Sequence, residues 1–380
     1  MQLYTEKNSD GTKYLRLKGN ELRDIIKRRL EDYDVPIICE YIKTTPTIVK
    51  LDLAYNSIGD KGFIEIVYRV LNKLHNLQYL NVMHNDITEK GIQAIATLGQ
   101  NLKLKTLRLV GNKIGSEGGK LIGLLLATNP ILEHLDLAET DQTLSSLAFI
   151  TTSLREDRGF NKNIKVLDIS RIIPSFIRSQ YQSGHLAETI GDMLKFNTTL
   201  VELHLQKCEL DGHDIELMLI GMKHNITLKF LDLGYNRFSN MGMELLANYL
   251  PSSGLIALNI AGNSIGNIGA RALSAALPFT KIRLLDISSN RIQQKGVHVI
   301  LNSIRKPHKL KFFSLWGNEM TDLTNETLYR IYNENIIDPK YCDVHVYIVD
   351  GKYYAARNTH CLYKHQFYCE LDYGFAQPKR

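Results

Sequence analysis

The stretch LIALNIAGNSIGNIG, residues 255–269, contains the pattern that decides the fold of this chain. It follows the pattern LxxLxLxxNxIGxxG, and eleven stretches of the chain repeat that phrase more or less completely. The clearest copies place an asparagine at the same point, at Asn56, Asn85, Asn112, Asn236, Asn263, Asn290 and Asn318. These positions follow one another at 29 and 27 residues, and later at 27, 27 and 28. So regular a period indicates one structural unit used many times.

Each copy divides into a short strand and a helix. Leu51 and Leu53 alternate along the strand and point into the core, whereas Lys50 and Asp52 point to the opposite face. In the second half, apolar residues keep the i, i+3, i+4 spacing of an amphipathic helix, with Asp60 as the expected N-cap. A glycine recurs where a Cβ would obstruct packing of helix on strand, at Gly62, Gly91, Gly118, Gly242, Gly269 and Gly296.

This arrangement is typical of a leucine-rich repeat solenoid. Periods of 27–29 residues with a true helix resemble ribonuclease inhibitor and the Ran GTPase-activating protein. We therefore predict an α/β horseshoe with parallel strands inside and helices outside. The asparagines are expected to form a structural ladder that satisfies backbone groups where the chain leaves each strand.

The solenoid is predicted to span residues 48–335, between two caps. Residues 1–47 form an N-terminal cap with a partial repeat, and residues 336–380 form a small C-terminal cap that is β-rich and aromatic. Within the latter, residues 344–349 and 352–356 predict a hairpin around Asp350-Gly351, and residues 362–370 could add a third strand.

The repeat is irregular at about residues 140–208. The ladder asparagine is replaced by Thr140, Ile172 and Cys208, and the extra length falls in residues 155–163 and 171–184. These loops could be tolerated surface insertions, or a lip that contacts a partner or allows a bend.

The composition bounds the class of protein. The 380 residues carry a net charge of +6, with the basic residues scattered, which favours solubility over direct nucleic-acid binding. The first residues lack the apolar region of a signal peptide, and no apolar run is long enough to cross a bilayer. Five cysteines without a clustered cap suit a reducing, intracellular compartment.

Two sets of residues are candidates for partner binding on the concave face. The first is an acidic stripe in the middle strand column that could attract a basic partner, with Asp136, Asp168, His204, Asp232 and Asp286 as its binding residues. The alternative is that short polar residues are simply common at such positions. The second is an apolar cluster on a face expected to be polar, formed by Phe230, Tyr235, Leu284, Phe312 and Trp316. The alternative is that the C-terminal cap folds back and covers this cluster.

No sequence motif indicates catalytic activity. No phosphate-binding loop, nucleophile elbow or HExxH sequence is present in a suitable context, so we predict no catalytic residues, no cofactor and no small-molecule substrate. Cys342, His345, Cys361, His365 and Cys369 together resemble a dispersed zinc set. Because no close cysteine pair anchors them, we interpret them as packing residues and predict no metal.

Both ends of the chain resemble the vertebrate family of leucine-rich repeat-containing protein 34. The resemblance rests on residues 8–12 with Leu15, Leu17 and Asn20, and on residues 316–318, 343–344, 349–353 and 374–376. The tail between Arg357 and Tyr373 and the central loops depart from the family.

The resemblance implies a non-enzymatic scaffold with protein partners, bound on the concave face or the central loop. It implies either a motile cilium or flagellum axoneme, in the cytoplasm and cytoskeleton, or a nucleolar factor linked to ribosome production in germ or stem cells. GTPase activation of the Ran type is the remaining alternative, although nothing near Asn20, Arg23 or Asn56 reproduces that family's N-terminal segment.

Overall fold

The computed structural model of the protein describes residues 1–158, 163–172, 181–306 and 310–361. They form two compact units. Unit 1 comprises Met1–Gln182 with Phe196–Leu200, and unit 2 comprises Ser183–Lys195 with the chain from Val201 onward. The two long loops expected at residues 155–163 and 171–184 lie partly outside the described residues.

Unit 1 is a stack of strand–helix repeats. An antiparallel pair, β1 and β2, opens it, and β2 to β7 then pair in parallel. The strands are β1 (Thr5–Lys7), β2 (Lys13–Arg16), β3 (Ile48–Asp52), β4 (Tyr79–Asn81), β5 (Thr106–Arg108), β6 (His134–Asp136) and β7 (Val166–Asp168). The helices are α1 (Gly19–Ile26), α2 (Val35–Thr44), α3 (Asp60–Ile66), α4 (Glu89–Ala96), α5 (Gly115–Thr128) and α6 (Leu144–Ser153).

Unit 2 repeats the same plan. Strands β8 to β12 pair in parallel, and the antiparallel hairpin of β13 and β14 follows them. The strands are β8 (Glu202–His204), β9 (Phe230–Asp232), β10 (Ala257–Asn259), β11 (Leu284–Asp286), β12 (Phe312–Ser314), β13 (Val344–Val349) and β14 (Lys352–Arg357). The helices are α7 (Ser183–Phe196), α8 (Gly212–Met222), α9 (Ser239–Tyr249), α10 (Asn267–Ala276), α11 (Gln294–Ser303) and α12 (Asp322–Asn333).

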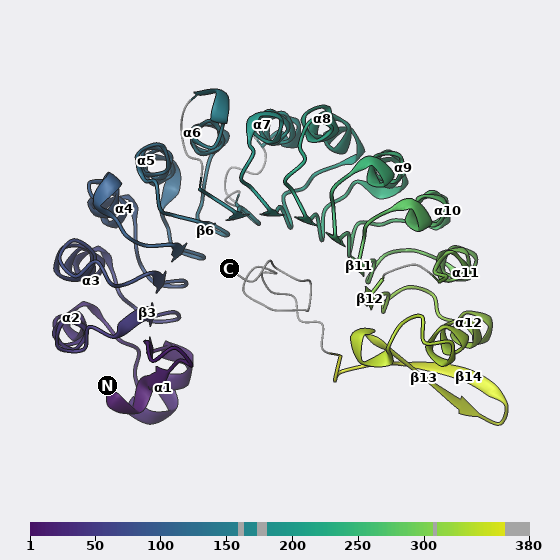
Figure 1. Ribbon diagram of the computed structural model, residues 1–380, viewed down its shortest axis with the longest axis horizontal. Helices are drawn as coiled ribbons and strands as arrows, with labels where there is room; N and C mark the ends of the chain where they lie inside the picture. Colours follow the sequence, from purple (N-terminus) through teal and green to yellow (C-terminus); the bar gives the residue numbers. More distant parts are fainter. Residues whose placement is uncertain (159–162, 173–180, 307–309, 362–380) are drawn as a thin grey trace. The chain divides into compact units, whose positions relative to one another are not determined.

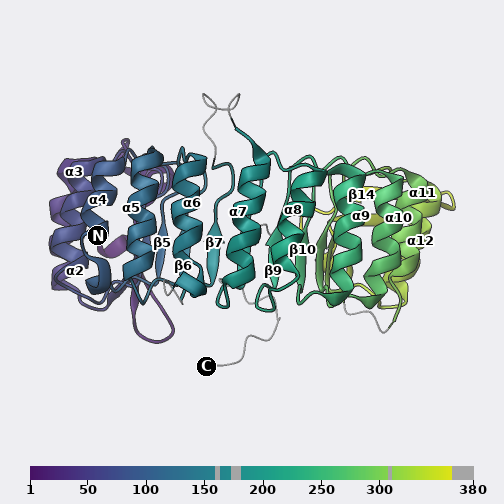
Figure 2. The same ribbon diagram turned by 90° about the horizontal axis from the view of Figure 1, so that it is seen from above.

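The register of the strands explains the core. Parallel neighbours pair residue for residue, so that the central leucine of each strand lies beside that of the next, from Leu51 to Leu80 and Leu107 in unit 1. Within each unit the helices lie side by side and cover one side of the strands (Figures 1 and 2). The leucine rows are buried between these two layers, which confirms the predicted leucine-rich repeat fold.

The C-terminal hairpin lies where the sequence predicts it, with β14 one residue longer. Both backbone polar groups of Tyr353, at the start of β14, bond side chains of α12. The N–H donates to Asp322 Oδ1 at 2.7 Å, and the carbonyl accepts from Asn325 Nδ2 at 3.0 Å. The Tyr332 hydroxyl donates to the Val344 carbonyl at 2.7 Å. The hairpin therefore packs on the last helix of unit 2. The possible third strand at residues 362–370 lies outside the described residues.

One carboxylate ends the strand series of unit 2. In earlier repeats a strand-exit N–H bonds a carbonyl of the next strand, as Ile287 N–H does with Ser314 at 2.8 Å. After β12, Asp343 Oδ1 accepts from Leu315 N–H at 2.8 Å, and Oδ2 accepts from Trp316 N–H at 3.1 Å. The Asp343 side chain thus takes the place of a further strand.

Candidate functional site

The ladder asparagines connect neighbouring repeats. Asn56 Nδ2 donates to the carbonyls of Leu17 at 2.8 Å and Leu53 at 2.9 Å, while its Oδ1 accepts from Leu30 N–H at 3.0 Å. In each case, Nδ2 donates to one carbonyl of its own repeat and one of the preceding repeat, at Asn56, Asn85, Asn112, Asn236, Asn263, Asn290 and Asn318. One amide therefore satisfies buried backbone groups in two repeats.

The residue before each ladder position has a left-handed backbone. Positive φ occurs there at each of the ten equivalent positions from Tyr55 to Gly317, for example 62° at Tyr55, 51° at His84 and 57° at Tyr235. Gly111 and Gly262 occupy the same position, and a Cβ at Gly262 would lie 2.4 Å from the Tyr235 ring. These glycines thus give the preceding aromatic ring room to lie across the next repeat. In the sequence, this arrangement corresponds to an aromatic residue, such as Tyr235, one repeat before a glycine, such as Gly262.

The expected acidic stripe has a local structural role. Asp136, Asp168, Asp232 and Asp286 each accept a hydrogen bond from the backbone N–H two residues later, and Asp52 does the same at 3.0 Å from Ala54 N–H. Asp136, Asp232 and Asp286 are buried, and Asp168 is half-buried. The side chains close Asx turns where the strands end, which is the physical reason for short polar residues in this column.

The unit 1 part of this column is electrostatically strained. Asp136 is buried, and Arg108 Nε donates to its Oδ2 at 3.1 Å. Burial raises the pKa of Asp136, the nearby Asp168 carboxylate raises it further, and the Arg108 guanidinium opposes both. At the start of the unit, burial and the Asp52 charge raise the pKa of Tyr14, whose hydroxyl donates to Asp52 Oδ2 at 2.9 Å.

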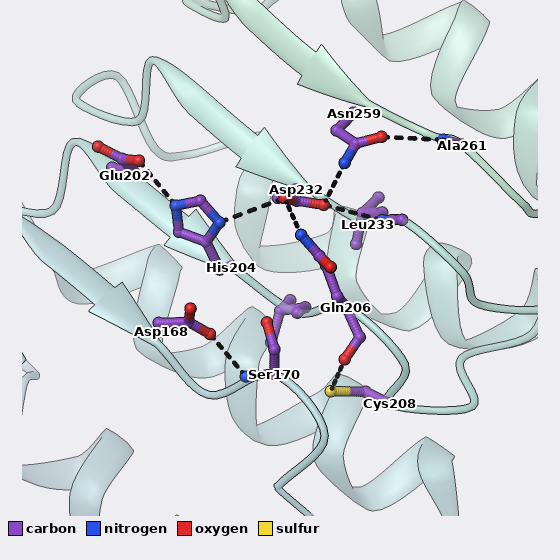
Figure 3. A network of polar contacts seen from close by, with 12 residues as sticks. Asp168, Ser170, Glu202, His204, Gln206, Cys208, Asp232, Leu233, Asn259 and Ala261 are labelled. Atoms are coloured by element: carbon purple, nitrogen blue, oxygen red, sulfur yellow. Dashed lines mark hydrogen bonds and ion pairs between the residues drawn. The ribbon is translucent and has the colours of Figure 1, made fainter. Parts of the chain in front are cut away.

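In unit 2, His204 lies between two carboxylates (Figure 3). Its Nε2 is 2.7 Å from Glu202 Oε1, and its Nδ1 is 3.2 Å from Asp232 Oδ2. Only a protonated imidazole can donate from both nitrogens. Asp232 also accepts from the side-chain amides of Gln206 and Asn259. The side chains of Glu202, His204 and Asp232 are all buried and contact one another, so the network fixes the strand column rather than presenting free acid and base groups.

The apolar candidates of unit 2 form one row, but most of them are buried. Phe230, Leu284 and Phe312 lie with Ala257 in register on β9 to β12, which places Leu284 beside Phe312 as expected. Phe230 is 8% exposed and Phe312 is 1% exposed. The Tyr341 ring packs edge-on against Phe312, with the centroids 4.8 Å apart. The expected open apolar patch is therefore a packed cluster in which a residue of the C-terminal region takes part.

Tyr235 and Trp316 remain accessible. Tyr235 is 45% exposed, and the Lys207 ammonium lies 5.3 Å from its ring centroid. Trp316 is half-buried, with its backbone N–H bonded to Asp343. Each residue follows shortly after the end of a strand of unit 2, Tyr235 after β9 and Trp316 after β12. Both therefore lie near the carboxyl ends of the strands rather than within them.

A second row of side chains, missed by the sequence analysis, caps the helices. The expected N-cap role of Asp60 for its own helix is wrong, since Gly59 is the N-cap and Asp60 Oδ1 accepts from Thr88 and Gly91 N–H of the next repeat. Asn240 and Asn267 cap the following helices in the same way. The recurring glycine allows this contact, because a Cβ at Gly91 would lie 2.9 Å from Asp60 Oδ1.

Metal and membrane features complete the description. Among the described residues there is no group of three or more His, Cys, Asp or Glu residues placed to hold a metal ion, and His365 and Cys369 of the possible zinc set lie outside them. Cys342 is buried and Cys361 is half-buried. In the part of the chain that the structure covers, no helix combines the length and apolar character needed to span a bilayer.

The comparison with known families agrees with the repeat pattern. The family model described as Leucine Rich repeat matches residues 45–67, 73–96, 100–123, 224–247 and 255–274. Among solved structures, a chain in the crystal structure of the Rad7 and Elc1 complex in yeast aligns with a TM-score of 0.48 and 14% identity, covering 87% of this chain and 89% of that chain.

Two curated relatives share sequence as well. Ribonuclease inhibitor of Sus scrofa is 26% identical over 57% of this chain and 46% of its own length. Leucine-rich repeat-containing protein 34 of Mus musculus is 30% identical over 63% of this chain and 56% of its own length. The chain spans about half the length of these curated relatives. The resemblance to leucine-rich repeat-containing protein 34 is confirmed, and the residues that the family model matches are leucine-rich repeats.

Proposed function

We propose that the protein is a non-enzymatic scaffold that binds a protein partner through the strand side of unit 2. The supporting observation is Tyr235, an aromatic side chain that is 45% exposed on a left-handed backbone, with Gly262 beside it and the Lys207 ammonium above its ring. A ring held in one place loses little conformational freedom on binding, and Tyr and Trp dominate binding energy at interfaces.

The polar groups of the same face support a binding role over a catalytic one. Asp232 accepts from His204, Gln206, Asn259 and a backbone N–H, which uses the acceptor capacity of a carboxylate. A general base needs a lone pair directed toward a substrate. The buried apolar row of Phe230, Leu284 and Phe312 then stiffens the strands that carry Tyr235 and Trp316.

The test compares Tyr235→Ala combined with Trp316→Ala against Tyr55→Ala. Tyr55 occupies the same left-handed position in unit 1 and is the matched control. Tagged protein is purified from ciliated or germ cells, and the co-purifying proteins are quantified by mass spectrometry. We expect the double variant to lose a defined set of proteins that the control retains, with melting temperatures within about 2 °C of wild type. The same proteins on all three baits would overturn the proposal.

The cellular assembly is proposed from the resemblance to leucine-rich repeat-containing protein 34. We place the protein in a motile cilium or flagellum axoneme, with a nucleolar role in ribosome production as the alternative. Imaging the tagged chain in ciliated and germ cells separates the two. GTP hydrolysis by small GTPases is expected to stay at its basal rate, and an acceleration of about 100-fold that one arginine variant removes would instead indicate GTPase activation.

A further inference from the structure

A groove of about 840 Å³ lies on the helix side of unit 1, across α4, α5 and α6. Its floor is a stripe of α5 at the spacing of one helix face, and its walls come from the two neighbouring helices. The lining residues are Glu89, Gln93, Glu117, Lys120, Leu121, Gly123, Leu124, Ala127, Ala148, Phe149, Thr152 and Ser153. Within unit 1, this side is opposite to the strand column.

The lengths of the helices help to create the groove. α4 has 8 residues and α5 has 14, so the C-terminal half of α5 extends past the end of its neighbour. Leu124 in that half is 56% exposed, and Phe149 on α6 is 54% exposed. Two large apolar side chains thus lie in solvent along one groove, where burial on binding would be favourable.

Glycines bring α6 against α5 and fix the second wall. A Cβ at Gly123 would lie 3.1 Å from the carbonyl carbon of Phe149, and one at Gly119 would lie 1.8 Å from Gln142 Oε1. A side chain at Gly123 would meet the backbone of α6, and one at Gly119 would also meet α6, because its Cβ would lie 2.8 Å from Ser146 Cβ. The separation of the Phe149 wall from the α5 floor is therefore set by the backbone rather than by flexible side chains.

The charge along the groove is uneven. Glu89 and Glu117 both lie in the first turn of their helices, and α4 and α5 run side by side in the same direction, so that both carboxylates lie at one end (Figure 2). Lys120 pairs with Glu117 at 2.7 Å, which leaves an excess of negative charge there. The other end is lined by Ala127, Thr152 and Ser153, which are uncharged.

We propose that this groove binds an amphipathic α-helix of a protein partner, with its apolar face on Leu124 and Phe149 and its basic residues at the end near Glu89 and Glu117. The floor from Glu117 to Ala127 rises by about 15 Å, which matches about three helical turns. A helix laid between two others packs by the same ridges and grooves that join α4, α5 and α6. The site goes beyond the proposed function, because it uses helices of unit 1 and none of the residues assigned to binding in unit 2.

The probe is a pair of fluorescent peptides of about 18 residues, long enough to be helical in isolation. Both carry a leucine stripe at i, i+3, i+4 and i+7, and one ends in lysines where the other ends in glutamates. Binding to the full chain is measured by anisotropy. We expect the lysine peptide to bind about tenfold tighter than the glutamate peptide, and Glu89→Lys with Glu117→Lys to reverse that preference.

A second pair of variants separates the groove from general stickiness. Leu124→Gln with Phe149→Ala is expected to weaken the lysine peptide at least about tenfold. Ile220→Gln with Ile268→Gln, on equally exposed outer helix positions of unit 2, should leave it unchanged. Equal weakening by both pairs, or no preference between the peptides, would overturn the proposal.

Two other occupants are outcomes of the same measurements. Sedimentation showing a dimer of the chain that Leu124→Gln abolishes, without peptide binding, would assign the groove to a second copy. Binding of laurate without peptide binding would assign it to a small apolar ligand. Either result overturns the helix proposal, and neither bears on Tyr235, so this test can fail independently of the proposed function.

Discussion

Asn290 in unit 2 and Thr140 in unit 1 hold the same position in their repeats, but they tie the chain together differently. Asn290 Nδ2 donates to the Ile260 carbonyl of the preceding repeat at 3.0 Å, and its Oδ1 accepts from Ile265 N–H at 3.1 Å. The Thr140 hydroxyl donates to Leu137, a carbonyl of its own repeat, at 2.6 Å. The amide therefore joins two repeats, whereas the bond donated by the hydroxyl joins residues of one.

The difference is one of reach and of valence. An amide carries both donors and an acceptor at the end of its side chain, while a hydroxyl has a single proton close to the backbone. Beside Thr140, Gln142 Nε2 donates to the Thr140 carbonyl at 2.9 Å, but Gln142 Oε1 is buried without a hydrogen-bond partner. At this position the repeat is thus joined to the preceding one by a backbone bond, from Gly115 N–H to the Thr140 carbonyl at 3.1 Å, rather than by a ladder amide.

The largest loss of stability is expected for Asn290→Ala. The change removes three donated and two accepted hydrogen bonds at a buried site, and we expect a loss of about 2–4 kcal/mol in the free energy of unfolding. Urea unfolding followed by circular dichroism measures it. Asn263→Ala is the matched variant and should lose about 1–3 kcal/mol, because Asn263 Oδ1 is buried without a partner. A larger loss at Asn263 than at Asn290 would contradict the ladder argument.

The end of unit 2 sharpens the comparison, because a carboxylate there replaces the missing next strand. Asp343→Ala leaves the N–H groups of Leu315 and Trp316 without their acceptor, so we expect a loss of about 1–3 kcal/mol at pH 7. Asp343→Asn retains an acceptor oxygen and should lose much less. Chemical denaturation of both variants and wild type measures the difference.

The pH dependence of Asp343 provides an independent check. Burial raises the pKa of Asp343 to about 6, and the Asp286 charge adds to that rise. The folded state therefore holds this proton more tightly than the unfolded state, so its contribution to stability is present below pH 4 and is lost as the pH rises through 6. The free energy of unfolding of Asp343→Asn minus that of wild type should therefore increase as the pH rises from 4 to 7. A constant difference over that range would show that the carboxyl group titrates normally.

The smallest effect is expected at the interrupted position. Thr140→Ala removes one hydrogen bond within a repeat, at a loss of about 0.5–1.5 kcal/mol. Urea midpoints of this variant and of Asn112→Ala, the preceding ladder position in unit 1, are the appropriate pair. If the two variants unfolded at the same urea concentration, the distinction between an intact and an interrupted ladder would have no energetic meaning.

Sequence periodicity was sufficient for the repeats themselves. The alternation of Leu51 and Leu53 with polar neighbours, and the spacing of Asn236, Asn263 and Asn290, predict strand, core and strand exit because each depends on residues close together in the chain. The hairpin at residues 344–357 was predictable for the same reason, since its Asp350-Gly351 turn is local.

Features that depend on the neighbouring repeat were not predictable in this way. Asp60 was interpreted as capping its own helix, but it caps the next one, about 28 residues away in sequence. Asp232 and Asp286 were interpreted as a surface stripe, although they close turns. Burial of Phe312 requires Tyr341, which lies a whole repeat further on. The groove over α5 depends on a difference in length between two neighbouring helices, which repeat spacing does not reveal.

The carboxylate of Asp343 also affects how the protein behaves in a crowded solution. A parallel strand at the end of a stack exposes a row of unsatisfied backbone groups, and such an edge readily templates another chain. Here Asp343 occupies the N–H groups of Leu315 and Trp316, and its own N–H lies 3.4 Å from the Phe313 carbonyl. The edge of β12 is thereby occupied by the segment that carries Asp343, with a carboxylate on the N–H groups that another strand would need, so pairing of a further strand at this edge is disfavoured.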